Sequence, residues 1–447
     1  MKIQELHNKQ IAILGFWKEG RSTLDFLLKL WINDITILDQ KPQNIDNTNI
    51  KTITGDNYLD SLWDFDVIFK SPGISPFDEH ISPHREKLSS QTELFFDNYT
   101  GKTIGITATK GKSTISTILY KSLLKAGLKV KLVGNIGTPV LDEIDIVNDT
   151  DSYDYIIYEL SSYMLDTAQP DLDIAILGNI YTDHLDWHLN QENYRRAKLN
   201  LLKNSHHKII NVNLQESSDI IKDENTHFFG TGGNYHAKQW DFFIGNRKVM
   251  DKDDVKIKWT HNAINITSII WVFDILWLDI ASIKNVTQNF GWLPHRLENI
   301  GTYKWITFID DAISTTPEST LAGLRTYKDS VSTLFLWGTD RGYDFKELAT
   351  YIHENNIRNI IFFSPSGSRI KAEIHAYIES LDSQKSVIDT YNILETNSMQ
   401  EAVAFAYKHS DSWSICLLST ASPSYSNWKN FEAKGDDFKA QVIAQGQ

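Results

Sequence analysis

The chain is 447 residues long, and its 57 Asp and Glu outnumber its 44 Lys and Arg, which gives a formal net charge of −13 at pH 7. This length exceeds one hydrophobic core and predicts two to four domains. The acidic balance argues against a nucleic-acid surface, which needs a basic face.

Three further features bear on location. The single cysteine, Cys416, excludes an internal disulfide and suits a reducing compartment. No secretory signal is visible at the N-terminus. The most apolar later run, residues 269–281, is interrupted by Asp274 and Asp279 and is too short to span a bilayer, which predicts a buried helix. We therefore expect a cytoplasmic protein.

Residues 1–100 read as the start of a Rossmann-like α/β domain. We expect strands over Ile11–Leu14, Ile35–Leu38 and Val67–Phe69, a turn over Gly15–Gly20 and a helix from Arg21. Asp39 and Ser71-Pro72-Gly73 then follow strand carboxyl ends, where such sheets bind ligands. The sequence lacks GxGxxG, so a dinucleotide is not favoured, but a diphosphate at the Gly20–Ser22 helix start is physically reasonable.

The segment Lys102–Thr117, KTIGITATKGKSTIST, predicts a phosphate-binding loop. A β-branched strand and a small-residue loop lead into Gly-Lys-Ser-Thr, which opens a helix whose N–H groups point at phosphate oxygens. Lys112 can reach the outer phosphates, and the Ser113 hydroxyl can bind Mg²⁺. Because Gly105 lies one residue too far upstream for GxxxxGK, an ordinary strand-to-helix turn is the alternative.

Two more segments of this middle block carry candidate metal ligands. Glu159 closes the strand Tyr155–Tyr158 and either holds the Mg²⁺ of a nucleotide or caps the following turn. After the strand Ile174–Leu177, the loop YTDHLDWH gathers Asp183, His184, Asp186 and His188. Its spacing fits no common zinc pattern, and histidines after a buried strand more often form hydrogen bonds than bind metals.

Lys198 lies on the next predicted helix, in NYRRAKLNLL. Most such lysines are solvated surface charges. Arg195 and Arg196 nearby would disfavour the protonated amine.

A third block starts near Leu293-Pro294-His295-Arg296. We expect strands over Thr333–Trp337, Asn359–Phe363 and Ser414–Leu418. Arg296 could contact a phosphate or form an interdomain salt bridge, and Asp310-Asp311, after Ile309, could meet a ribose or a lysine. The hydroxyl-rich loop Ser419–Ser424 and the helix start at Lys429-Asn430-Phe431 suit either carboxylate capture or plain turns.

Eight segments in this order resemble the Mur ligases almost from end to end. They are TATKGKST, GNIGTP, ELSSYML, NIYTDHLDWH, YRRAKLNL, HNAIN, LPHRLE and LLSTASPSYSNWKNFEAKGDDF. The resemblance implies an α/β fold of three domains: a Rossmann-like uridine-substrate domain (1–100), a P-loop ATPase-like central domain (101–290) and a Rossmann-like C-terminal domain that binds glutamate (291–447).

The resemblance also assigns roles to residues. It implies four catalytic residues: Lys112, Glu159, His184 and Lys198. It implies these ATP contacts: Thr109, Lys110, Gly111, Lys112, Ser113, Thr114, Asn262, Asn265, Arg296 and Asp311. Two Mg²⁺ ions would be held by Ser113, Glu159, His184 and a carbamylated Lys198. The substrates would be contacted by Asp39, Gln40, Ser71, Asn135, Ser161, Thr315, Ser424 and Phe431.

The implied reaction is the ATP-dependent joining of glutamate to UDP-N-acetylmuramoyl-L-alanine in peptidoglycan synthesis, by a monomer that acts on small molecules through an acyl phosphate. Several residues depart from the family pattern: Ala108 and Lys110 in the phosphate loop, Ile313 in place of a lysine, and Arg341-Gly342 in place of Gly-Lys. Ile313 and Arg341-Gly342 fall in segments expected to face the glutamate carboxylates, so these departures leave the handedness of the amino acid open. D-glutamate is the first choice, and L-glutamate, with a separate epimerase, is the alternative.

Two other interpretations compete with this one. A folate polyglutamate synthetase shares the ATP-binding core, but the uridine-type domain and the KNFEAKG segment argue against it. A non-catalytic nucleotide-binding protein would be expected to lose Glu159, His184 or Lys198, and all three are present.

Overall fold

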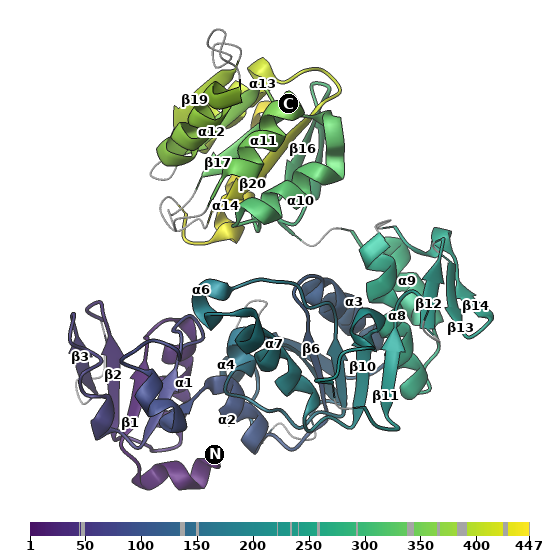
Figure 1. The fold of residues 1–447 in the computed structure, drawn as a ribbon. Helices are drawn as coiled ribbons and strands as arrows, with labels where there is room; N and C mark the ends of the chain where they lie inside the picture. Colours follow the sequence, from purple (N-terminus) through teal and green to yellow (C-terminus); the bar gives the residue numbers. More distant parts are fainter. Residues whose placement is uncertain are drawn as a thin grey trace. The chain divides into compact units, whose positions relative to one another are not determined.

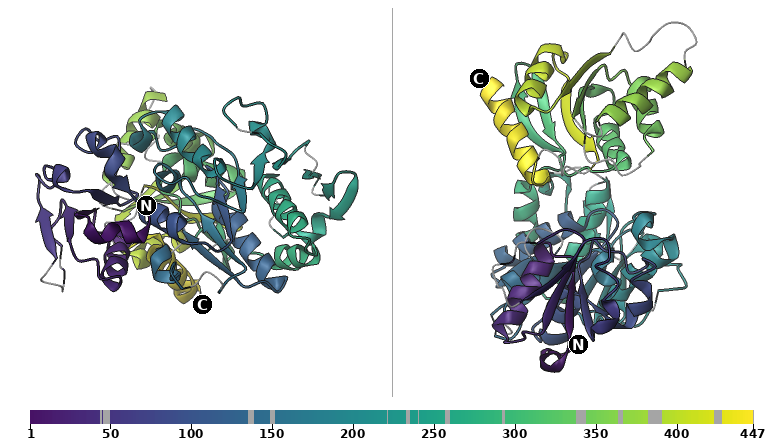
Figure 2. Two further views of the ribbon diagram at one scale, coloured as in Figure 1. Left: turned by 90° about the horizontal axis from the view of Figure 1, so that it is seen from below. Right: turned by 90° about the vertical axis from the view of Figure 1, so that its left-hand side faces the viewer.

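The computed structural model describes residues 1–43, 45, 50–134, 139–148, 152–220, 222–232, 235–239, 241–256, 260–291, 294–337, 344–363, 367–381, 391–422 and 428–446. Its contacts divide the chain into two compact units, Met1–Phe290 and Gly291–Gln447. Figures 1 and 2 show three β-sheets with helices packed on them. The predicted α/β class is therefore confirmed, while the domain boundaries at residues 100 and 290 stay a prediction.

The first sheet is entirely parallel and has the order β3-β2-β1-β4-β5. Its elements are β1 (Ile11–Leu14), α1 (Lys18–Lys29), β2 (Ile35–Asp39), β3 (Lys51–Thr54), β4 (Val67–Lys70), β5 (Leu88–Ser89) and α2 (Gln91–Asn98). The chain runs outward from β1 to β3 and then returns to β4 on the other side of β1. Sheets with such a reversal bind ligands in a crevice beside it, so a ligand crevice is expected at the carboxyl ends of β1 and β4.

The turn after β1 is shorter than predicted, because α1 begins at Lys18 and not at Arg21. Gly15 takes a positive φ of 85°, and Trp17 is extended as the N-cap, so the helix is already formed at Gly20. A Cβ on Gly20 would lie 2.4 Å from the Gly15 carbonyl oxygen. Glycine at position 20 therefore lets helix and turn approach each other at the crevice.

Replacing Gly20 with alanine is expected to destabilise the protein by about 1–3 kcal/mol, because the new methyl group meets backbone that must shift. Denaturant unfolding measures the loss. Gly291→Ala is the matched control, since nothing lies within 4 Å of its added Cβ. Equal stability of the two variants would contradict the proposed close packing at Gly20.

The second sheet has the order β14-β13-β12-β11-β10-β9-β6-β8-β7. Its strands are β6 (Thr103–Thr107), β7 (Val130–Gly134), β8 (Tyr155–Glu159), β9 (Ile174–Leu177), β10 (His207–Asn211), β11 (Thr226–Phe229), β12 (Tyr235–Lys238), β13 (Asp241–Ile244) and β14 (Arg247–Met250). Its helices are α3 (Lys112–Lys125), α4 (Val140–Glu143), α5 (Ser162–Leu165), α6 (Leu185–His188), α7 (Gln191–Leu199), α8 (Thr260–Ile275) and α9 (Ala281–Asn289).

Two features of this sheet differ from the prediction. The sequence predicts the order strand, helix, strand throughout the chain, but β11 to β14 follow one another directly and end in two antiparallel pairs. The helix predicted over 269–281 is interrupted: α8 ends at Ile275, Trp277 is 94% exposed, and α9 starts at Ala281. Among the helices of the described residues, none combines the length and apolar character needed to cross a membrane.

The third sheet, in the C-terminal unit, has the order β15-β16-β20-β17-β18-β19 and is parallel except for the β15–β16 pair. Its strands are β15 (Glu298–Tyr303), β16 (Ile306–Asp310), β17 (Val331–Trp337), β18 (Asn359–Phe363), β19 (Asn392–Thr396) and β20 (Ile415–Ala421). Its helices are α10 (Pro317–Tyr327), α11 (Lys346–Glu354), α12 (Gly367–Leu381), α13 (Met399–His409) and α14 (Phe431–Gly446).

Candidate functional site

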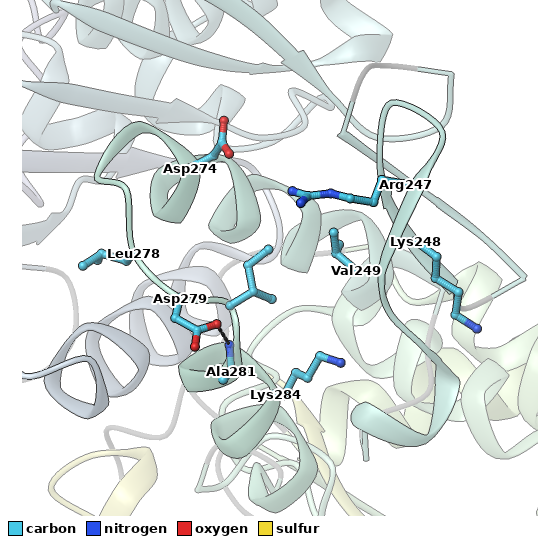
Figure 3. Close-up of a pocket in the computed structure, with 9 residues that line it drawn as sticks. Arg247, Lys248, Val249, Asp274, Leu278, Asp279, Ala281 and Lys284 are labelled. Atoms are coloured by element: carbon cyan, nitrogen blue, oxygen red, sulfur yellow. Dashed lines mark hydrogen bonds between the residues drawn. The ribbon is translucent and has the colours of Figure 1, made fainter.

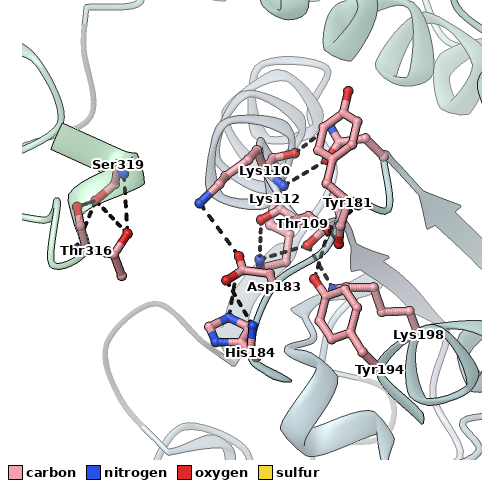
Figure 4. A network of polar contacts seen from close by, with 12 residues as sticks. Thr109, Lys110, Lys112, Tyr181, Asp183, His184, Tyr194, Lys198, Thr316 and Ser319 are labelled. Atoms are coloured by element: carbon pink, nitrogen blue, oxygen red, sulfur yellow. Dashed lines mark hydrogen bonds and ion pairs between the residues drawn. The ribbon is translucent and has the colours of Figure 1, made fainter. Parts of the chain in front are cut away.

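The candidate site lies at the carboxyl ends of three neighbouring strands of the second sheet, β9, β6 and β8. Their register pairs Ile106 with Glu159, and Thr107 with Leu177, so the loops that follow all leave the sheet at one edge. Figure 4 shows the side chains that these loops bring together. Parallel α/β sheets bind their ligands at this edge.

The predicted phosphate loop runs from the end of β6 to α3, which begins at Lys112 as predicted. Gly111 caps α3 with a φ of 95°, and a Cβ there would lie 2.7 Å from the amide nitrogen of Asn265. Gly105 stays inside β6, where an added Cβ would press on Leu172. The offset from GxxxxGK therefore arises because Gly105 packs in the strand and takes no part in the loop.

The Glu159 carboxylate is fully buried and faces the first turn of α3. Ser113 donates to its Oε1 at 3.0 Å, and Ser116 donates to its Oε2 at 2.9 Å. Glu159 was predicted either to hold the Mg²⁺ of a nucleotide or to cap the following turn. Its contacts with α3 fit the role of a metal ligand beside the phosphate loop. Ser116 was missed in the sequence, although its spacing of three residues from Ser113 puts both hydroxyls on one helix face.

Two lysines share a single acceptor at this edge. The ammonium groups of Lys112 and Lys198 each lie 2.9 Å from the Ala108 carbonyl oxygen. Lys198 is buried, and burial followed by the charge of Lys112 holds the pKa of its amine well below the ordinary value. The predicted effect of a neighbouring positive charge on the Lys198 amine fits this geometry. The charge comes from Lys112, however, and not from Arg195, which pairs with Asp219 at the surface.

The loop after β9 places only part of its predicted cluster at the site. His184 has a half-exposed side chain, its Nδ1 lies 2.8 Å from the Tyr163 hydroxyl, and its Nε2 lies 3.8 Å from Asp183. The Asp183 carboxylate is 3.7 Å from the Lys110 ammonium. His188 is buried instead among aromatic rings, and the side chain of Asp186 lies outside the described part.

His188 has a structural role. Its Nε2 lies 3.0 Å from the Ser162 hydroxyl, and burial, with the charge of His184 next, lowers its pKa to about 3. A neutral, enclosed imidazole of this kind packs the loop against α5 and α7.

The remaining predicted contacts of the middle block lie around the phosphate loop. Thr109 donates its backbone N–H to Asn179, and its hydroxyl lies 2.8 Å from the Tyr194 hydroxyl. Thr114 is buried in the first turn of α3. Asn262 and Asn265 are buried on α8, and Asn265 lies against Gly111.

These residues fit Mg²⁺, the metal that the resemblance implies. Mg²⁺ prefers oxygen ligands, and the Ser113 hydroxyl and the Glu159 carboxylate are already 3.0 Å apart. Both face the N-terminus of α3, where phosphate oxygens would supply further ligands. His184 lies across the same edge (Figure 4).

The crevice of the first sheet holds the predicted uridine-side residues. Asp39 is buried, and its two oxygens accept the backbone N–H groups of Phe16 and Lys41 at 2.8 and 2.9 Å. The Ser71 hydroxyl donates to the Gly15 carbonyl at 2.6 Å, while Gln40 is exposed. Ser161 caps α5 by accepting from the Met164 N–H. Asn135 lies outside the described residues.

Lys70, which the sequence analysis missed, links this crevice to α6. It is buried, and its ammonium donates to the carbonyls of Ile74 and Ser71 and lies 5.1 Å from the Trp187 ring. Ser75 donates to the Trp187 carbonyl at 2.6 Å. Burial lowers the pKa of Lys70 to about 8 against the opposing pull of Asp166. The loop after β4 is thereby fastened to the loop that carries His184.

The Lys70→Met variant is expected to differ from the wild type in the pH dependence of stability. Between about pH 8 and the ordinary lysine pKa of 10.5, the unfolded state binds more protons at this group than the folded state. The contribution of Lys70 to the free energy of unfolding therefore rises with pH across this window, and the variant lacks this contribution. Urea unfolding at several pH values measures it. Lys51→Met, at an exposed lysine of β3, is the control. If the free energy of unfolding changed with pH in the same way in the wild type and in Lys70→Met, the lowered pKa of the buried Lys70 would be contradicted.

The C-terminal unit has its own cluster at the carboxyl ends of β16 and β20. Asp311 is buried, accepts hydrogen bonds from the Leu297 N–H and the Ser419 hydroxyl, and has a pKa raised to about 6 by burial, which Arg296 partly opposes. Lys434, missed in the sequence, donates to Thr420 at 3.0 Å, and burial lowers its pKa to about 7.

Three other predictions concern the same unit. Thr315 is half-buried between β16 and α10, and Phe431 opens α14 with its ring 6.0 Å from that of His295. Ser424 and Arg341-Gly342 lie outside the described residues.

His295, Glu298 and Asp310 also come close together, but as an ion-pair cluster. His295 Nδ1 lies 2.8 Å from Asp310, and Lys439 lies 2.7 Å from Glu298. A lysine at this position competes with any cation.

A cavity of about 500 Å³ lies away from the phosphate loop, between β14 and the turn from α8 to α9 (Figure 3). Its charged lining groups are largely paired: Lys248 with Asp241, Lys284 with Asp254, and Asp274 with Tyr235. None of the predicted site residues lines it.

Comparisons with known proteins show which proteins the chain is similar to. Residues 106–270 match the Mur ligase middle domain. The UDP-N-acetylmuramoylalanine–D-glutamate ligases of Clostridium perfringens and Clostridium acetobutylicum are each 29% identical to the chain, over 98% of its length and 97% of theirs.

Solved structures show the same fold at lower identity. The MurF ligase of Thermotoga maritima, in complex with ADP, has a TM-score of 0.56 at 17% identity and covers 99% of this chain and 97% of its own. The UDP-N-acetylmuramate-alanine ligase MurC of the same organism has a TM-score of 0.56 at 16% identity, covering 98% of this chain and 100% of its own.

Proposed function

Because the chain belongs to the Mur ligase family, a family of ATP-dependent ligases, we propose that it adds D-glutamate to UDP-N-acetylmuramoyl-L-alanine in peptidoglycan synthesis. One observation carries the proposal most directly. At the end of β6, the side-chain nitrogens of Lys112 and Lys198 converge on one carbonyl, and the Glu159 carboxylate faces the first turn of α3. Such an arrangement suits a nucleotide triphosphate and its metal.

The acidic net charge does not oppose this role, because the positive field is local. Lys112 and Lys110 flank the phosphate loop, and the N-terminus of α3 adds its own partial charge. Mg²⁺ held by Ser113, Glu159 and His184 would screen the crowded phosphate oxygens and polarise the γ-phosphoryl group.

Lys198 would serve as a carbamate. Its neutral amine nitrogen attacks the carbon of CO₂ and releases one proton to solvent, which converts the amine into an anionic carbamate. This step requires the neutral amine, and burial together with the charge of Lys112 favours that form. The carbamate would then pair with Lys112 and offer an oxygen ligand beside Glu159.

The reaction divides into two transfers. The terminal carboxylate of the L-alanyl group attacks the γ-phosphorus of ATP, ADP leaves, and an acyl phosphate forms. The amine of glutamate then attacks the acyl carbon, loses a proton, and phosphate departs as the amide forms. Since no protein nucleophile is needed, Lys112 and the α3 N-terminus act by positioning and by stabilising charge.

The handedness of glutamate is the less constrained part of the proposal. Ile313, where related ligases often carry a lysine, is half-buried, and its N–H donates to the His295 carbonyl. An aliphatic side chain there removes one cation from the segment expected to face the glutamate carboxylates. Arg296 and Lys434 are cations of the C-terminal unit that interact electrostatically with Asp311.

Phosphate release from ATP tests the proposal. We expect release only when UDP-N-acetylmuramoyl-L-alanine and glutamate are both present, faster with D- than with L-glutamate. ATP consumption that is independent of the uridine substrate would contradict the function. Turnover with L-glutamate but not with D-glutamate would support the proposed ligation and would identify L-glutamate as the amino acid that is added.

A further inference from the structure

We infer that Tyr163 is a positioning residue of the cation site, whose hydroxyl fixes the ring of His184 so that Nε2 is presented to the metal. The inference deepens the proposed function and rests on it. Tyr163 belongs to α5, which follows the strand that ends at Glu159, and His184 directly precedes α6. Their side chains meet with 2.8 Å between the Tyr163 hydroxyl and His184 Nδ1.

Packing determines where the Tyr163 hydroxyl lies. The ring centroid of Tyr163 is 4.7 Å from that of Trp187 and 5.8 Å from that of His188, with the His188 ring nearly parallel to it. Trp187 and His188 are themselves buried. Lys70 and Ser75 hold Trp187 from the first sheet. The hydroxyl is therefore anchored by a rigid aromatic group, as a positioning residue must be.

His184 needs such an anchor. Its side chain is 43% exposed, and its backbone is left-handed, with φ 55° and ψ 35°. Non-glycine residues in this conformation persist when surrounding contacts hold them. A half-exposed imidazole on a loop would otherwise sample several orientations, only some of which face the end of α3.

The hydrogen bond also accommodates the tautomer that binds metal, because a tyrosine hydroxyl can accept from Nδ1–H. A neutral imidazole carries one N–H, and the partner of one ring nitrogen decides which nitrogen keeps its lone pair. When Nδ1–H donates to the Tyr163 oxygen, Nε2 keeps the lone pair that binds metal. His184 Nε2 lies on the side of Asp183, 3.8 Å from its carboxylate, so the two groups present nitrogen and oxygen to the same space. Ligating histidines usually gain orientation and basicity from such a partner.

Tyr163→Phe isolates the hydroxyl, because phenylalanine preserves the ring that packs on Trp187 and His188. Mn²⁺ titration in the presence of ADP and bicarbonate, followed by electron paramagnetic resonance, measures binding without turnover. His184→Ala identifies the Mn²⁺ site that depends on this residue. We expect Tyr163→Phe to weaken that site about tenfold. Tyr181→Phe, which removes a hydroxyl from an exposed tyrosine of the same loop, is the control and should bind as the wild type does.

Nitrogen-15 spectra of the metal-free protein give a second readout. The His184 signals, assigned by their absence from His184→Ala, should show Nδ1–H in the wild type and a mixture of tautomers in Tyr163→Phe. Unchanged Mn²⁺ affinity together with an unchanged tautomer would overturn the inference, as would a wild type with no His184-dependent Mn²⁺. Weakened Mn²⁺ binding in a protein that does not ligate glutamate would keep the inference and reject the proposed function.

Discussion

Replacing Lys198 with alanine is expected to lower turnover by about 10²–10³-fold while leaving the fold intact. The change removes the buried amine that lies 2.9 Å from the Ala108 carbonyl, and with it the proposed carbamate beside Glu159. Steady-state phosphate release measures the loss, and circular dichroism checks the fold. Short carboxylates such as acetate or formate should restore part of the activity, since they can supply the missing anion.

Lys203→Ala is the matched control for this prediction. Lys203 lies five residues further along, after α7, and is exposed. Its removal should leave turnover unchanged. Full activity in Lys198→Ala would contradict a catalytic role for the carbamate. A loss of activity that short carboxylates do not restore would assign Lys198 a direct role as a cation.

Replacing Lys112 with methionine is expected to lower turnover by about 10²–10³-fold and to weaken nucleotide binding. Methionine keeps an unbranched side chain of similar length but removes the charge at the first position of α3. Calorimetric titration with ADP and Mg²⁺ separates the binding loss from the catalytic loss. The variant also removes the like charge nearest Lys198, so the Lys198 amine should protonate more readily.

Lys125→Met controls for the loss of one lysine from the same helix. Lys125 lies in the last turn of α3, is exposed, and is far along the helix from the phosphate loop. It should bind ADP as the wild type does. Equal ADP affinity in Lys112→Met and Lys125→Met would place the triphosphate elsewhere.

The sequence by itself determined the elements whose signals are local. A β-branched run followed by a small-residue loop and Gly-Lys-Ser-Thr predicted β6, the loop and the start of α3 at Lys112, because a left-handed cap at Gly111 and a helix N-terminus depend on adjacent residues. The strands β1, β9 and β18 were predicted with their observed bounds for the same reason: short apolar runs end where the chain must turn.

Tertiary structure decided which of these local pieces interact. Ser113 and Ser116 reach Glu159 because the register of β6 and β8 aligns Ile106 with Glu159, and such a pairing between residues about fifty positions apart leaves no local pattern. The charge that acts on Lys198 comes from Lys112, which is distant in the sequence, and not from Arg195 on the same helix, because the Arg195 guanidinium pairs with Asp219.

Burial was the other quantity that only the packed chain could decide. Lys70 reads as an ordinary strand-end lysine, yet it lies enclosed between two carbonyls and the Trp187 ring. His188 and His184 are four residues apart in one motif, but one is enclosed by aromatic rings and the other faces the site. The free energy of a charged or polar group depends on everything that excludes water from it, and that surrounding shell is assembled from distant parts of the chain.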